Sequence, residues 1–176
     1  MDRVMPTIPM FSIIGFSGSG KTTLLVKLIA ELKGRGLRVA VIKHDAHEFD
    51  IDHEGKDSWR FTHAGADVTA IVSSKKMALI ENRAASLDAA LERIKDVDII
   101  LTEGYKSGDW PKIAVWRAKS GKPLPVPAEQ CVAIATDVDE HVGAPRFGLD
   151  DIGGLADFLL NLPPSGPRRD RGCCRS

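Results

Sequence analysis

With 176 residues, of which 43% are hydrophobic, the chain is long enough for one domain with a substantial core. Its 24 Lys and Arg residues balance its 24 Asp and Glu residues, so charge does not favour a general nucleic-acid binder. No stretch approaches the ~18 apolar residues of a transmembrane helix, and three cysteines form neither a disulfide framework nor a zinc spacing. We therefore expect a reduced, cytoplasmic protein with no membrane or nucleic-acid partner.

Short apolar strands alternate with amphipathic helices along most of the chain. In chain order we predict a strand at 10–15, a helix at 21–33, a strand at 38–43, a short helix at 57–64, strands at 68–73 and 77–82, a helix after Ser86, strands at 97–102, 112–117 and 131–136, and a last helix beginning at Asp150 or Asp151. This alternation predicts an α/β fold with a mostly parallel sheet covered on both faces. Residues 163–176 lack apolar periodicity, so we predict a disordered tail after a single domain at 1–162.

A phosphate-binding loop is the strongest motif. Residues 15–22 read GFSGSGKT and match G-x-x-x-x-G-K-[ST], with a predicted strand before and a helix after. Glycines let the backbone N–H groups turn towards a phosphate, the lysine reaches the β- and γ-phosphates, and the threonine hydroxyl coordinates Mg²⁺. The residues expected to bind nucleotide are Gly15, Ser17, Gly18, Ser19, Gly20, Lys21, Thr22 and Thr23. The predicted architecture is thus the three-layer P-loop NTPase fold, a mostly parallel β-sheet flanked by helices.

An acidic partner for the metal ion follows the most apolar later strand. VDIILTEGYK, residues 97–106, carries Glu103 at the carboxyl end of its strand, the edge at which open α/β sheets bind ligands. Glu103 resembles a Walker B carboxylate that holds Mg²⁺ directly or through water. We predict Thr22 and Glu103 as the metal-binding side chains. Asp98 lies at the opposite end of that strand and is not expected to take part.

The stretch VIKHDAHEFDIDHEGKDS, residues 41–58, is unusually rich in histidine and carboxylates. It leaves a strand at the same predicted edge, so Asp45 is placed to orient a water near the γ-phosphate, and we name Lys21, Asp45 and Glu103 as catalytic candidates. Residues 52–55 fit D-x-x-G, a pattern in which a glycine N–H senses the γ-phosphate. A transition-metal site using His44 with His47 or His53, and a plain solvated loop, are the alternatives.

These motifs together resemble the MobB family, the molybdopterin-guanine dinucleotide biosynthesis proteins B. The resemblance rests on GFSGSGKTTLL, on KHD and GKDS in register with it, on LTEGYK and on PKIAVWR, and it extends from about residue 10 to residue 160. It implies a GTP-binding α/β protein with weak GTPase activity, usually a homodimer, with GTP and Mg²⁺ as ligands. Its implied partners are molybdopterin and the guanylyltransferase that joins GMP to it. Lys106, Lys112 and Arg117 then become candidates for holding the pterin phosphate.

The sequence matches the guanine-recognition motif of P-loop proteins only in part. Residues 136–139 read Thr-Asp-Val-Asp, which keeps the first and last positions of [NT]-K-x-D and lacks the lysine. Asp139 is the motif match and Asp137 the alternate, and the expected guanine preference rests mainly on the resemblance.

Two other functions share the phosphate loop. A small-molecule kinase would use Asp45 to deprotonate an acceptor hydroxyl, but we find no arginine-rich lid. A scaffold that binds GTP without using its hydrolysis would dock the transferase. No arginine finger is evident within the chain, so we expect slow hydrolysis without a partner.

Overall fold

A computed structural model describes residues 8–44, 49–140 and 143–163, and these form two compact units. Of the described residues, the first unit combines 8–44 with 96–140 and 143–163, and the second comprises 49–95. The first contains β1 (Met10–Ile14), α1 (Lys21–Gly34), β2 (Val39–Lys43), β5 (Ile99–Glu103), β6 (Lys112–Trp116), η1 (Ala118–Ser120), η2 (Ala128–Gln130), β7 (Cys131–Thr136), β8 (Arg146–Phe147) and α4 (Ile152–Asn161). The second contains α2 (Asp57–His63), β3 (Val68–Val72), β4 (Met77–Glu81) and α3 (Leu87–Arg93).

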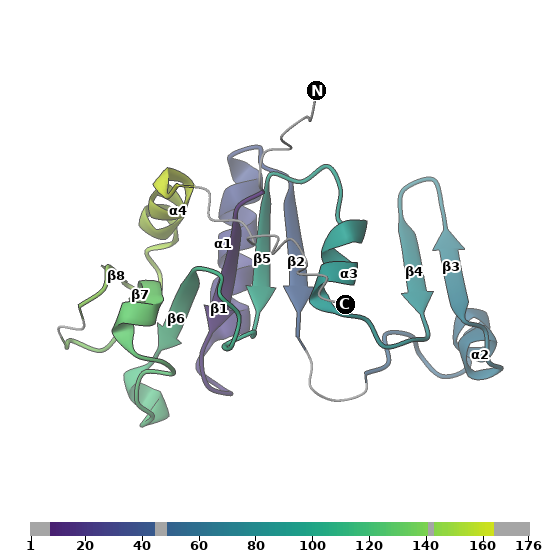
Figure 1. Cartoon of the computed structure of the whole chain (residues 1–176), viewed down its shortest axis with the longest axis horizontal. Helices are drawn as coiled ribbons and strands as arrows, with labels where there is room; N and C mark the ends of the chain where they lie inside the picture. The colour runs from purple at the N-terminus through teal and green to yellow at the C-terminus, as the bar shows by residue number, and fades with distance from the viewer. Residues whose placement is uncertain (1–7, 45–48, 141–142, 164–176) are drawn as a thin grey trace, which may run out of the picture. The chain divides into compact units, whose positions relative to one another are not determined.

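The first unit is built on a six-stranded parallel sheet in the order β2-β5-β1-β6-β7-β8 (Figure 1). Its central strands are buried because they carry short β-branched and apolar runs that are covered on both faces. The fold class is therefore confirmed as a mostly parallel sheet flanked by helices. The two-residue strand β8 was not predicted.

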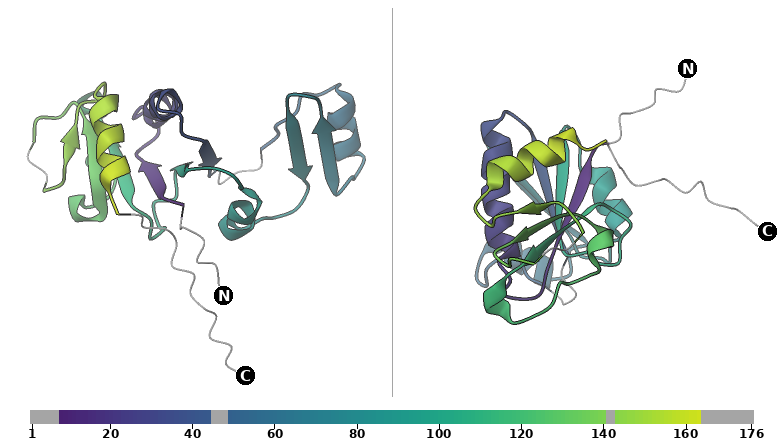
Figure 2. Two further views of the ribbon diagram at one scale, coloured as in Figure 1. Left: turned by 90° about the horizontal axis from the view of Figure 1, so that it is seen from above. Right: turned by 90° about the vertical axis from the view of Figure 1, so that its left-hand side faces the viewer.

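Helices α1 and α4 cover one face of this sheet (Figure 2). Leu24, Leu28 and Leu32 of α1, spaced at helical intervals, pack on apolar side chains of the strands, together with Leu155 and Leu159 of α4. The opposite face carries a smaller cluster around Ile14 and Ile134, packed against side chains of the segment 117–130. That segment contains the single-turn helices η1 and η2.

The second unit contains an antiparallel hairpin with a helix against it. β3 and β4 pair antiparallel in a sheet of their own, and α2 packs on β3, where the hydroxyls of Thr62 and Thr69 lie 3.1 Å apart (Figure 1). Glu81 on β4 accepts hydrogen bonds from Arg93 and Arg83, which together lower the pKa of its carboxyl. The sequence predicted these two strands but not that they leave the parallel sheet.

No helix in the described ranges is long and apolar enough to span a bilayer.

Asp98 precedes β5 at the amino-terminal edge of the sheet, away from the phosphate loop. Its carboxylate accepts hydrogen bonds from the guanidinium of Arg38 (2.9 Å) and from the Arg38 backbone N–H (2.7 Å). These contacts lower the pKa of Asp98 to about 2.

Replacing Arg38 with Met should therefore make stability less dependent on acid pH. The pKa of Asp98 is lower in the folded than in the unfolded chain, so its contribution is present above about pH 4 and disappears as pH falls towards about 2. Arg38→Met should lower the urea midpoint near neutral pH, and the difference from wild type should shrink as the solution is acidified. A pH-independent difference would show that Arg38 acts through packing alone.

Candidate functional site

The loop from Gly15 to Gly20 connects β1 to α1 in a conformation that depends on glycine. Gly18 and Gly20 have positive φ angles of 76° and 93°, and Gly20 is the residue that precedes the helix. A Cβ on Gly15 would lie 2.5 Å from the Ser19 hydroxyl and 2.9 Å from the Val115 carbonyl oxygen. The loop is thus wound tightly against the sheet, with the amino terminus of the 14-residue helix α1 directly behind it.

Two polar side chains of this loop fit an anionic ligand. The Lys21 ammonium donates to the Phe16 carbonyl across the loop at 3.0 Å. The Ser19 hydroxyl is buried without a hydrogen-bond partner among the described residues, an arrangement that is costly unless a ligand satisfies it. Ser17, inside the motif, and Thr23, directly after it, are exposed, and Thr23 borders the pocket described below.

Thr22 and Glu103 come together at the carboxyl edge of the sheet. Glu103 ends β5, which pairs with β1, and the Thr22 hydroxyl lies 3.0 and 3.2 Å from its two carboxylate oxygens. A hydroxyl and a carboxylate are hard oxygen ligands of the kind that Mg²⁺ prefers, so this pair fits the predicted metal. The chain then turns sharply, because both Gly104 and Tyr105 have positive φ angles, 101° and 56°. For tyrosine this conformation is uncommon and marks a constrained position next to the candidate metal ligand.

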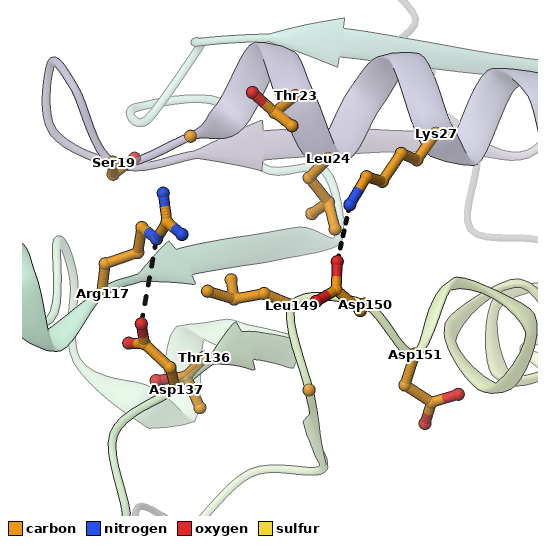
Figure 3. Close-up of a pocket in the computed structure, with 12 residues that line it drawn as sticks. Ser19, Thr23, Leu24, Lys27, Arg117, Thr136, Asp137, Leu149, Asp150 and Asp151 are labelled. Carbon is orange, nitrogen blue, oxygen red and sulfur yellow. Dashed lines mark hydrogen bonds and ion pairs between the residues drawn. The ribbon is translucent and has the colours of Figure 1, made fainter.

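A pocket of about 440 Å³ lies beside the loop (Figure 3). Its volume is in the range of small-molecule sites. Its lining residues come from the phosphate loop and α1, from the ends of β6 and β7, and from the turn before α4: Ser19, Gly20, Thr23, Leu24, Lys27, Arg117, Thr136, Asp137, Gly148, Leu149, Asp150 and Asp151.

Two ion pairs border this pocket. Lys27 on α1 reaches Asp150 at 2.6 Å, which lowers the pKa of the Asp150 carboxyl, and Nε of Arg117 lies 3.8 Å from Asp137 (Figure 3). Neither Lys27 nor Asp150 was predicted as a site residue from the sequence. Arg117 could have been placed here, because it directly follows a parallel strand at the ligand-binding edge.

The structure separates the two carboxylates of the Thr-Asp-Val-Asp segment. Asp137 lines the pocket, whereas Asp139 does not and has a fully exposed side chain 3.5 Å from Arg146. The position of the motif match is therefore outside the pocket, and the alternate is inside it.

The residues predicted beyond β2 are distributed over both units. Asp45 and His47 lie outside the described residues, so the catalytic role of Asp45 stays a prediction. His44 is the last residue of the first unit before the chain enters the second unit. Its backbone N–H donates to the Glu103 carbonyl, and its ring centroid lies 4.4 Å from that of Tyr105. Residues 49–58, including the D-x-x-G segment, belong to the second unit. Over the described ranges no group of three or more His, Cys, Asp or Glu side chains is arranged to hold a metal ion.

The three candidate pterin-binding cations have different environments. Lys112 is buried and its ammonium donates to the Gly108 carbonyl, so this side chain stabilises the fold and is not exposed to a ligand. Arg117 lines the pocket. Lys106 lies over the ring of Phe16 in the phosphate loop, 4.5 Å from its centroid. Lys122, which was not predicted from the sequence, lies 5.1 Å from the same ring.

Comparison with known proteins identifies the family. A sequence model of molybdopterin guanine dinucleotide synthesis protein B, MobB, matches residues 10–137. The chain belongs to the MobB family. A MobB relative from Haemophilus influenzae, a molybdopterin-guanine dinucleotide biosynthesis adapter protein, is 39% identical over 158 residues, which cover 88% of this chain and 89% of the relative. The adapter protein of the same name from Escherichia coli K12 is 35% identical over 161 residues, 87% of this chain and 92% of that one.

The fold agrees with solved MobB structures. The crystal structure of Bacillus subtilis MobB superposes with a TM-score of 0.71 at 30% identity, covering 86% of this chain and 96% of that one. The MobB resemblance inferred from the sequence is thus confirmed.

Proposed function

We propose that this chain is a GTP-binding adapter with slow GTP hydrolysis, which assists attachment of GMP to molybdopterin in molybdenum cofactor biosynthesis in the cytoplasm. The observation that carries this function is the convergence of Lys21, Thr22 and Glu103 at a tightly wound phosphate loop beside a pocket of nucleoside size. Membership of the MobB family and the adapter names of its relatives support the pathway.

Each residue has a defined task in this function. The loop N–H groups and the Lys21 ammonium bind the triphosphate, and the Ser19 hydroxyl gains a partner there. Thr22 and Glu103 would hold Mg²⁺, which would neutralise charge on the β- and γ-phosphates. Asp45 would position the attacking water. Lys106 and Lys122 beside Phe16 offer two cations to the anionic pterin partner.

Isothermal titration calorimetry with GTP and ATP, with and without Mg²⁺, tests this directly. We expect Mg²⁺-dependent GTP binding in the micromolar range or tighter and weak ATP binding. Preference for ATP would favour the kinase, and no binding of either nucleotide would refute the function. Hydrolysis measured with and without the guanylyltransferase then separates a regulated GTPase from a scaffold, because only the GTPase should turn over faster with its partner.

The second unit supports a homodimer. The cross-strand pairs Val72–Met77 and Ala70–Leu79 place their side chains on one face of the hairpin, the face that also bears Val68. Val68, Val72, Met77 and Leu79 are 50%, 72%, 69% and 50% exposed. This face also carries Glu81, the cross-strand partner of Val68, and within the described part of the second unit its apolar side chains are exposed. A two-stranded hairpin with such a face is marginal alone. We assign this face to contact with a second copy, in agreement with the homodimer implied by the family resemblance.

Replacing Val72 with Lys should convert the dimer to a monomer, because Val72 is the most exposed of these apolar side chains and the charge would have to be desolvated in the contact. Light scattering after size-exclusion chromatography measures the mass. Ser74→Lys, which adds the same charge in the exposed turn of the same hairpin, is the matched control and should remain dimeric. A wild-type monomer, or a Val72→Lys dimer, would rule out this interface.

A further inference from the structure

Arg117 and Asp137 form a pair at the ends of two neighbouring strands. β6 and β7 are parallel with Trp116 opposite Thr136, so the next residue of each strand emerges at the same edge of the sheet. Figure 3 shows the two side chains directed towards one another inside the pocket. The turn before α4 and the side chain of Lys27 border the same space.

The Asp137 carboxylate is held in a fixed position. Its Oδ1 accepts a hydrogen bond of 2.7 Å from the Ala118 backbone N–H, and its Oδ2 is 3.8 Å from Nε of Arg117. The chain turns directly after β7, since the Thr136 hydroxyl accepts from the Val138 N–H at 2.9 Å. This turn leaves Asp137 in the pocket and Asp139 outside it.

Arg117 also lies close to the phosphate loop. A Cβ built on Gly20 would lie 3.6 Å from Nη1 of Arg117, and both residues line the pocket. The guanidinium is therefore near both the loop and the carboxylate of Asp137. The Thr-Asp-Val-Asp segment lacks the lysine of [NT]-K-x-D, and Arg117 brings a cation to this place from the adjacent strand.

We infer that Asp137 is the residue that selects guanine and that Arg117 positions it, taking the place of the missing lysine; this inference rests on the proposed binding of a nucleoside triphosphate. Guanine presents two N–H donors, at N1 and the 2-amino group, which a carboxylate accepts together as charge-assisted hydrogen bonds. Adenine presents an unprotonated N1, so its complex leaves the carboxylate facing an acceptor. A site built around such a donor pair discriminates by about 100-fold or more.

The decisive experiment exchanges the carboxylate for an amide and the base for xanthine. Xanthine carries a carbonyl where guanine carries the 2-amino group, so the amide of Asp137→Asn can donate to it. We expect Asp137→Asn to lose at least about 30-fold in GTP affinity and to gain XTP affinity of similar size, since a mismatched polar pair is exchanged for a matched one. Asp139→Asn is the matched control and should leave both affinities unchanged.

The positioning role of Arg117 has a separate measurement. Inosine lacks the 2-amino group, so the ratio of GTP to ITP affinity reports one of the two hydrogen bonds to Asp137. Arg117→Ala should lower this ratio several-fold while the thermal unfolding midpoint stays close to that of the wild type, and Arg117→Lys should restore part of it. A ratio unchanged in Arg117→Ala would remove the arginine from base recognition.

The outcomes distinguish the inference from the function on which it rests. A wild-type protein that binds no nucleoside triphosphate refutes the proposed function. A wild-type protein that binds GTP and ITP equally, or an Asp137→Asn variant that still prefers GTP to XTP, overturns the role of Asp137 alone. A switch to XTP in Asp139→Asn would assign recognition to the motif match instead. The comparison of GTP with ITP uses the unaltered protein and does not depend on a variant that folds.

Discussion

Lys21→Ala is expected to lose GTP affinity by about 100-fold or more, because it removes the only side-chain ammonium of the loop motif and its charge-assisted bonds to phosphate. The fold should survive, since Lys21 contributes a hydrogen bond to the Phe16 carbonyl and no core packing. Calorimetry gives the affinity, and circular dichroism gives the unfolding midpoint.

The control for this variant lies on the same helix. Lys33→Ala removes an equal charge from the exposed last turn of α1, at the other end of the helix from the phosphate loop. It should bind GTP as the wild type does. Equal affinity in wild type and Lys21→Ala would remove the phosphate loop from the function.

Glu103→Gln should lower the apparent affinity for Mg²⁺, measured through GTP binding, by roughly 10- to 100-fold. The amide keeps the size of the side chain and an oxygen that can accept from Thr22, but it removes the negative charge that attracts the cation. A Mg²⁺ titration of GTP binding measures the change, and GTP hydrolysis should fall with it.

Asp98→Asn is the corresponding control, because it removes one carboxylate at the opposite edge of the sheet, just before the same strand. It should alter acid stability and leave the Mg²⁺ titration unchanged. If Glu103→Gln and wild type titrate alike, the metal is held by other groups and Glu103 only orients the Thr22 hydroxyl.

Much of the fold follows from local sequence patterns. The five long parallel strands and helix α1 are predicted within a residue or two at each end, because apolar runs and glycine boundaries define them. The pairing of β3 with β4 was not predicted. Strands of a helix-covered parallel sheet and strands of a hairpin both appear in the sequence as short apolar segments, and only long-range contacts distinguish the two arrangements. β8 has two residues, too few for any periodicity.

The site was predicted unevenly for a physical reason. Gly15 to Thr22 and Glu103 could be proposed as site residues because their chemistry requires fixed spacing, or a place at a strand end, that the sequence displays. The choice between Asp137 and Asp139 depends on a turn made by the Thr136 hydroxyl, which residue spacing does not encode. Arg117, Lys27 and Asp150 meet only through the order of strands and the packing of α4 against α1.

The order of strands also has a consequence for synthesis of the protein. β1 lies at the centre of the sheet, yet the buried hydrogen bond between Ser12 and Thr102 joins residues 90 positions apart, and the other neighbour of β1 is β6. Such non-local pairing slows folding, because long loops must close before contacts form. A nascent chain carries the complete phosphate loop early, but β1 has no strand to pair with until β5 and β6 have emerged from the ribosome. Nucleotide binding should therefore report completion of the fold, and GTP should favour full-length chains over truncated ones.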